Sequence, residues 1–184
     1  MIGVVLAGGA SRRMGDRDKL LETLGGRTLL ANAIERLEPQ VDRVVVAGPS
    51  TLEAHCSVPV LPDPIEGRAG PLAGLLAAMG VAGDDMVLTV PADTPFFPTD
   101  LAQRLDGEGA AIAWNAFPQP VFGAWPAALE PRLRAFLERG ERKIMLFARE
   151  VGFRRASFED ELAFFNVNTL DDLRQARALL EPAT

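Results

Sequence analysis

The chain has 184 residues, with 19 lysines and arginines against 25 acidic residues and a formal net charge of −6. The length predicts a single domain over residues 1–184, and the acidic balance argues against a general nucleic-acid binder. No apolar run approaches the roughly 20 residues of a membrane span, and the amino terminus does not resemble a signal peptide, so we expect a cytoplasmic protein with no membrane partner.

Histidine and cysteine are each used once, at His55 and Cys56. A single cysteine excludes an internal disulfide and a zinc ribbon, and serine-hydrolase triads need a histidine. The two residues are adjacent, and we expect them on a strand with side chains on opposite faces, so they do not form a pair. Unless His55 is an exception, the chemistry must use carboxylates, lysine, arginine and backbone groups, with magnesium as a candidate cation.

In the first half of the chain, short apolar runs alternate with helical patterns. The run at 2–7 is continuous, as in a parallel strand covered on both faces. Leucines and alanines at helical spacing, with a proline at the first turn of the second pattern, predict two helices. The expected strands are 2–7, 44–47, 58–61 and 86–90, and the expected helices are 28–37 and a segment from Pro71 through Met79 with a stripe of Leu72, Leu75, Leu76 and Met79.

The second half continues the alternation. Thr99 or Asp100 is expected to cap a helix through residue 105, and Thr169 with Asp172 forms a capping-box pattern for a last helix through residue 180. Two further helices are expected on either side of Gly140, and strands at 110–114, 121–125 and 162–166. Strands that alternate with helices predict an α/β fold of Rossmann-like architecture, with a mostly parallel central sheet and helices on both faces.

The loop from Gly8 to Lys19 follows the first strand, at the sheet edge where such folds bind ligands. Its glycines let backbone N–H groups approach a phosphate or a base, and Arg13 and Lys19 can neutralise a polyphosphate. The pattern is neither the dinucleotide-binding fingerprint nor a Walker loop. The structural alternative is a tight, solvated turn.

Two acidic residues follow other expected strands at the same edge. Asp93 comes after the strand at 86–90, and Asp63 after the strand at 58–61. Mg²⁺ binds one or two carboxylates together with phosphate oxygens and water, so Asp93 is a candidate ligand. The alternative for each aspartate is a turn residue.

Five segments together resemble the molybdenum cofactor guanylyltransferases of the nucleotide-diphospho-sugar transferase superfamily. They run in order from residue 3 to about residue 175: LAGGASRRMGDRDK at 6–19, GPLAG at 70–74, DTPF at 93–96, GERKIM at 140–145 and NVNT at 166–169. The first segment alone specifies only the superfamily, and the five together are more specific. One departure is Ala47, where some members carry an asparagine that contacts the nucleotide.

The resemblance implies a role for each matching residue. The backbone of four residues would hold a guanine nucleotide: Leu6, Ala7, Gly8 and Gly9. Lys19 and Arg13 would contact its phosphates, and Asp63 would be a further nucleotide contact. Asp93 would bind nucleotide and Mg²⁺, and the pterin-side pocket would be formed by Asn166 and Asn168. The structural alternative for the two asparagines is a turn before the last helix. Arg142 and Lys143 are either a further part of the site or a solvated helix start.

The implied reaction transfers GMP from GTP to the terminal phosphate of molybdopterin and releases pyrophosphate. The partners would be GTP and molybdopterin, and molybdenum-insertion proteins would hand over the molybdopterin. The cofactor would be Mg²⁺. A molybdopterin cytidylyltransferase or a sugar-phosphate nucleotidylyltransferase would use the same loop. The remaining alternative is a nucleotide-binding module without catalysis. Such a module predicts loss of the metal-binding acid or of the phosphate-binding lysine, whereas this chain has both Asp93 and Lys19.

Overall fold

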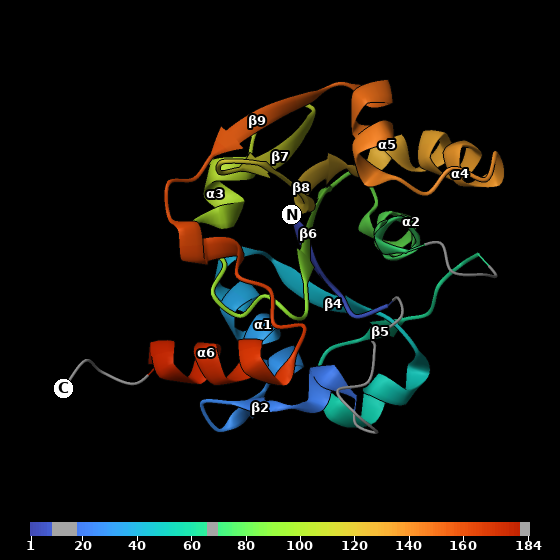
Figure 1. Ribbon diagram of the computed structural model, residues 1–184. Helices are drawn as coiled ribbons and strands as arrows, with labels where there is room; N and C mark the ends of the chain where they lie inside the picture. The colour runs from blue at the N-terminus through green and yellow to red at the C-terminus, as the bar shows by residue number, and fades with distance from the viewer. Residues whose placement is uncertain (9–17, 66–69, 181–184) are drawn as a thin grey trace.

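The computed structural model of the protein describes residues 1–8, 18–65 and 70–180 (Figure 1). Its centre is a seven-stranded sheet in the order β5-β4-β1-β6-β8-β7-β9. The first strand, β1, pairs in parallel with β4 and β6, and β8 runs antiparallel to its neighbours β6 and β7. The strands are β1 (Ile2–Leu6), β4 (Arg43–Ala47), β5 (Val60–Leu61), β6 (Met86–Pro91), β7 (Ala110–Trp114), β8 (Pro118–Pro126) and β9 (Phe153–Ser157).

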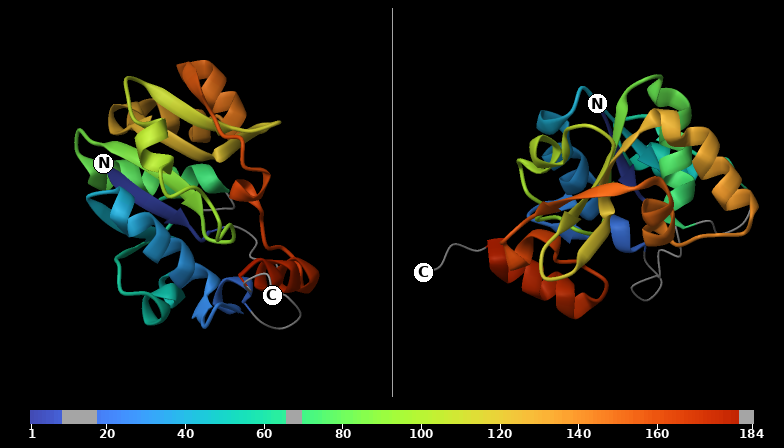
Figure 2. Two further views of the ribbon diagram at one scale, coloured as in Figure 1. Left: turned by 90° about the vertical axis from the view of Figure 1, so that its left-hand side faces the viewer. Right: turned by 90° about the horizontal axis from the view of Figure 1, so that it is seen from above.

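Helices cover both faces of this sheet, as Figures 1 and 2 show. On one face lie α2 (Pro71–Ala82), α4 (Glu130–Glu138) and α5 (Ile144–Val151), packed on Val4 and its neighbours. On the other lie α1 (Leu29–Leu37) and α3 (Leu101–Leu105), packed on Val5 and its neighbours. Alternate residues of β1 therefore enter different cores, and the predicted α/β fold with a mostly parallel sheet is confirmed.

The last helix, α6 (Leu170–Leu180), packs outside the two cores that cover the sheet. Its buried residues Leu173 and Ala176 join a small cluster with Leu24, Leu29 and Val167. None of the helices within the described ranges has the length and apolar character needed to span a bilayer.

The second helix, α2, is apolar around most of its circumference, so the predicted stripe is only part of its buried surface. It approaches the sheet closely at Gly74, where a Cβ atom would lie 2.6 Å from Leu6 Cδ2 and 2.8 Å from Ala47 Cβ. Gly70 precedes the helix with φ of +65°, a conformation that glycine adopts readily, and Pro71 occupies the first turn. The GPLAG segment thus has a structural basis: it lets α2 begin sharply and lie directly on β1 and β4.

We expect Gly74→Ala to destabilise the protein by about 1–3 kcal/mol, because Ala47 Cβ cannot rotate away from the added methyl group. Gly80→Ala in the same helix is the matched control, since a Cβ there meets nothing within 4 Å. The control should raise stability by about 0.5–1 kcal/mol through helix propensity. Urea unfolding of both variants measures this, and equal effects of the two substitutions would contradict close contact at Gly74.

Two expectations about the later strands are wrong. Residues 162–166 do not form a strand: Asp160 Oδ1 accepts a hydrogen bond from Leu162 N at 2.9 Å and starts a 3-10 helix, η5 (Glu161–Phe164). The last strand is instead β9, which pairs in parallel with β7. Its sequence, FRRAS, conceals it because β9 is an edge strand with two exposed arginines. These arginines are used locally, since the Arg155 guanidinium lies 4.2 Å from the centre of the Trp114 ring.

Three smaller differences concern short segments. His55 ends the 3-10 helix η3 (Ser50–His55) rather than lying on a strand, and the Cys56 thiol that follows donates to Leu52 O at 3.3 Å. The expected cap of α3 falls on Asp100, but its side chain makes no capping hydrogen bond. A short hairpin, β2 (Thr23–Leu24) and β3 (Arg27–Thr28), was not expected, and its two-residue Gly-Gly turn has positive φ at both positions.

Candidate active site at the carboxyl edge of the sheet

The carboxyl ends of β1, β4 and β6 lie side by side, and backbone hydrogen bonds continue beyond the strands. Ala7 N donates to Ala47 O at 2.8 Å, and Ala92 N donates to Leu6 O at 3.1 Å. The chain therefore leaves β1 in the middle of this edge, held on both sides. Open α/β sheets bind ligands at this position.

Lys19 brings three distant segments together at this edge. Its ammonium donates to Asp93 Oδ2 at 2.6 Å and to Asn168 Oδ1 at 2.9 Å. The residue is 7% exposed, so the charge is largely removed from water and needs such partners. It begins the 3-10 helix η1 (Lys19–Leu21), in which Asp18 Oδ1 accepts from Leu20 N at 3.0 Å. The helical turn fixes the lysine where the loop from β1 ends.

Asp93 lies in the segment 92–98 after β6, which we call the Asp93 loop. Its carbonyl oxygen accepts a hydrogen bond from Val167 N at 2.8 Å, so the loop is tied directly to the NVNT segment. Asp93 and Asn168 therefore lie together through both backbone and side-chain contacts. Asn166 lies in the same segment and is exposed.

The NVNT segment is in turn fixed by the start of α6. Asp172 Oδ2 accepts from Asn168 N at 2.9 Å and Thr169 N at 2.8 Å, while Asp172 N donates to Thr169 Oγ1 at 3.1 Å. The predicted capping box is confirmed, and it also holds the backbone of Asn168. The hydrogen bond from Asn168 N, with further help from Thr169 and the charge of Lys19, lowers the pKa of Asp172.

We expect Asp172→Asn to destabilise the protein by about 1 kcal/mol at neutral pH, the usual cost of a lost helix cap. Because the folded-state pKa is lowered, the carboxylate stabilises the fold above the ordinary aspartate pKa of about 3.9, and this contribution is lost as pH falls through the folded-state value. The difference in free energy of unfolding between wild type and Asp172→Asn should therefore be constant near neutral pH and shrink below about pH 4.

Asp171→Asn is the control for this prediction. It removes the same charge from the first turn of α6, but Asp171 pairs with Arg174 on the surface, and both side chains are more than 70% exposed. Its effect should stay within about 0.5 kcal/mol. Denaturant unfolding as a function of pH measures both variants, and a pH-independent deficit in Asp172→Asn would contradict the role of its charge.

Asp63 lies beside Gly8. A Cβ atom on Gly8 would stand 3.6 Å from Asp63 Oδ1 and 3.7 Å from Ala47 O, so any side chain at position 8 would contact the carboxylate. Partial burial raises the pKa of Asp63. Ala47 is 1% exposed, and its methyl group faces α2 at Gly74, so it offers the edge only its carbonyl.

The remaining sequence candidates divide into two groups. Gly9 and Arg13 lie outside the described residues. Arg142 donates to Leu137 O at 2.6 Å and Glu141 O at 2.7 Å, which connects α4 to the following turn, and Lys143 is the residue before α5. Arg142 thus has a structural role there. The residue that sequence reasoning missed is Val167, because its contribution is a backbone N–H that no side-chain pattern reveals.

An open, mostly parallel sheet with a lysine, carboxylates and a glycine at the carboxyl ends of its central strands is typical of α/β proteins that bind phosphate-containing ligands. Comparison with known proteins narrows this class. The family model described as "MobA-like NTP transferase domain" matches residues 3–151. The chain belongs to this family and is a nucleotidyltransferase.

Individual relatives match over nearly the whole chain. A molybdenum cofactor guanylyltransferase of Cereibacter sphaeroides is 44% identical over 98% of this chain and 97% of its own length. One from Shewanella putrefaciens is 38% identical over 94% of this chain and 93% of its own. Among solved structures, the molybdopterin-guanine dinucleotide biosynthesis protein A of Archaeoglobus fulgidus has a TM-score of 0.81 at 24% identity, covering 97% of this chain and 98% of that one, which shows the shared fold.

Proposed function

We propose that this protein transfers GMP from GTP to the terminal phosphate of molybdopterin, forming molybdopterin guanine dinucleotide and releasing pyrophosphate. The full-length relatives named for this guanylyltransferase support the proposal. The observation that carries it is the junction of Lys19, Asp93 and Asn168, because it connects the loop after β1 with the carboxyl-terminal NVNT segment. Donor and acceptor substrates would meet there.

In the proposed reaction, a terminal phosphate oxygen of molybdopterin attacks the α-phosphorus of GTP in line. The new O–P bond forms as the bond from the α-phosphorus to the bridging oxygen breaks, and pyrophosphate leaves. Such transfers depend on positioning and charge stabilisation and need no covalent protein nucleophile. This agrees with a chain that has one histidine, His55 at the end of η3, and one cysteine, Cys56 directly after it.

Lys19 and the strand ends would position the nucleotide. Lysine has three N–H donors, and within the described part of the chain Lys19 uses two of them on Asp93 and Asn168, which leaves one for a phosphate oxygen. Backbone groups of Leu6, Ala7 and Gly8 would approach the nucleotide where β1 ends, and Gly9 and Arg13 would extend this contact. Asn168 and Asn166 would face the pterin substrate, delivered by molybdenum-insertion proteins in the cytoplasm.

The donor set at the edge fits Mg²⁺ held jointly with substrate. Among the residues that the structure describes, no group of three or more His, Cys, Asp or Glu side chains could hold a metal ion alone. Mg²⁺ commonly binds one or two carboxylates and takes its other ligands from phosphates and water, so Asp93 would serve as its protein ligand. When bound, the cation supplies charge stabilisation at the phosphate oxygens.

We expect GTP to bind more tightly than ITP or CTP. A carboxylate beside Gly8 suits guanine, which carries adjacent N–H donors at N1 and N2, whereas ITP lacks the 2-amino donor and CTP presents its amino group beside an acceptor. The loss of one such hydrogen bond should weaken ITP by roughly tenfold. Calorimetry with the three nucleotides and Mg²⁺, followed by transfer to molybdopterin, tests the function. Equal or tighter CTP binding would favour a cytidylyltransferase and reject the guanylyl assignment.

We expect Lys19→Arg to lose activity on the order of a hundredfold. The longer, planar guanidinium cannot take the place of a buried ammonium between Asp93 and Asn168 without moving them, and a shift of about 1 Å can have this effect on rate. Lys19→Ala, which removes the charge altogether, is the comparison, and the two variants should lose similar activity with little change in melting temperature. Turnover at saturating GTP and Mg²⁺ measures both, and near-normal activity of Lys19→Arg would mean that position 19 needs only diffuse charge.

A further inference from the structure

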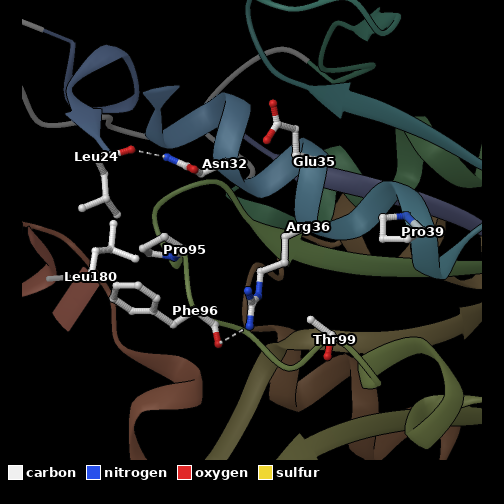
Figure 3. A pocket seen from close by; sticks show the side chains of 9 residues that line it. All are labelled: Leu24, Asn32, Glu35, Arg36, Pro39, Pro95, Phe96, Thr99 and Leu180. Atoms are coloured by element: carbon white, nitrogen blue, oxygen red, sulfur yellow. Dashed lines mark hydrogen bonds between the residues drawn. The ribbon is translucent and has the colours of Figure 1, made fainter. Parts of the chain in front are cut away.

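Side chains of α1 and the turn after it hold the Asp93 loop from behind. Arg36, in the last turn of α1, points across to the loop, where its Nε donates to Phe97 O and its Nη2 to Phe96 O at 3.4 Å (Figure 3). Gln40 Nε2 donates to Pro98 O at 3.1 Å, and its Oε1 accepts from Ala102 N at 3.1 Å. Three successive carbonyl groups, of residues 96, 97 and 98, are therefore bound by two side chains.

Packing alone does not fill the space between α1 and this loop. A pocket of about 330 Å³ lies there, lined by Asn32, Glu35 and Arg36 on the helix side and by Pro95, Phe96 and Thr99 on the loop side (Figure 3). Asn32 and Glu35 are engaged elsewhere, with Leu24 O at 2.9 Å and with the Arg27 guanidinium at 2.7 Å. Arg36 is thus the helix residue whose hydrogen bonds cross the pocket to reach the loop.

The two phenylalanines of the loop show why its backbone needs such an anchor. Phe97 is fully buried in the core beneath α1, with its ring centre 6.1 Å from that of Phe122. Phe96 turns the other way, toward Phe165 at 6.4 Å in the cluster beside α6. The backbone between the rings must keep one orientation for both to pack. Arg36 binds the carbonyl of the peptide that joins the two residues, at Phe96, and the carbonyl of the next peptide, at Phe97.

The Arg36 side chain is partly buried in this position. Partial burial lowers its pKa, yet an arginine stays protonated. The guanidinium uses its planar geometry on two backbone oxygens and stacks 5.7 Å from the Phe97 ring centre. A lysine would supply the charge and its donors from a single nitrogen, without the rigid planar fork by which Nε and Nη2 reach two separate carbonyls.

We propose that Arg36 is a positioning residue for Asp93: by fixing the carbonyls of Phe96 and Phe97 it sets where the Asp93 carboxylate stands relative to Lys19 and Asn168. On the other side of Asp93 the loop is already held, by Ala92 N on Leu6 O and by Val167 N on Asp93 O. Arg36 completes the anchorage. The inference rests on the proposed role of Asp93 in transfer, although the anchorage itself does not.

The experiment compares Arg36→Met and Arg36→Lys with Arg154→Met. Arg154 is a matched control because it also binds successive carbonyls, those of residues 104, 105 and 106, but it lies near the amino ends of the strands. Hydrogen–deuterium exchange of the amides from Asp93 to Leu101 reports the anchorage in the free protein. Guanylyl transfer as a function of Mg²⁺ concentration reports its consequence.

Arg36→Met should accelerate exchange in this segment, lower turnover roughly 10- to 100-fold and raise the Mg²⁺ concentration for half-maximal rate, with Arg36→Lys intermediate. Arg154→Met should lose thermal stability without these changes. If Arg36→Met does not fold, Arg36→Lys is compared with wild type by the same measurements. Wild-type exchange in the segment, or wild-type turnover and Mg²⁺ dependence, in the Arg36 variants would overturn the proposal. If the wild-type protein itself transfers no GMP, the proposed function fails, and exchange alone decides whether Arg36 anchors the loop.

Discussion

The candidate site depends on one buried ammonium group. Lys19 is almost removed from water. Its two hydrogen bonds, to Asp93 and Asn168, hold together the turn η1, the Asp93 loop and the NVNT segment that precedes α6. An unpaired charge at this position would cost several kcal/mol, so the three segments stabilise one another through it. The sheet brings the strand ends together, and the hydrogen bonds of Lys19 fix Asp93 and Asn168 beside each other at that edge.

Around this contact, each segment has its own attachment to the scaffold. The Asp93 loop is bound to β1 through Ala92 and to α1 through Arg36, and the NVNT segment is bound by Asp172 at the start of α6. These attachments use backbone carbonyls and N–H groups far more than side-chain pairs. Functional groups supported in this way can be held to a fraction of an ångström on rigid elements.

Sequence reasoning reached the parts of this arrangement that leave a periodic or compositional signal. The apolar run of β1, the helix with Pro71 at its first turn and the capping box at Thr169 were all predictable, and each is confirmed. The edge strand β9 was not, because FRRAS lacks an apolar alternation, and residues 162–166 were misassigned because aromatic residues also suit a 3-10 turn. Lys19, Asp93 and Asn168 were identifiable singly, but their junction and the role of Arg36 depend on tertiary contacts.

The distance along the chain between Lys19 and Asn168, 149 residues, has a consequence for biosynthesis. On the ribosome, β1, β4 and β6 emerge early and can begin to pair, whereas Asn168 emerges only near the end of translation. Contacts between such distant residues add little loop-closure entropy beyond that already lost when the sheet forms, so the junction should assemble last and quickly. A nascent chain would thus have a nearly complete sheet before Lys19 can form its hydrogen bond to Asn168. The complete site would then form in a single late step.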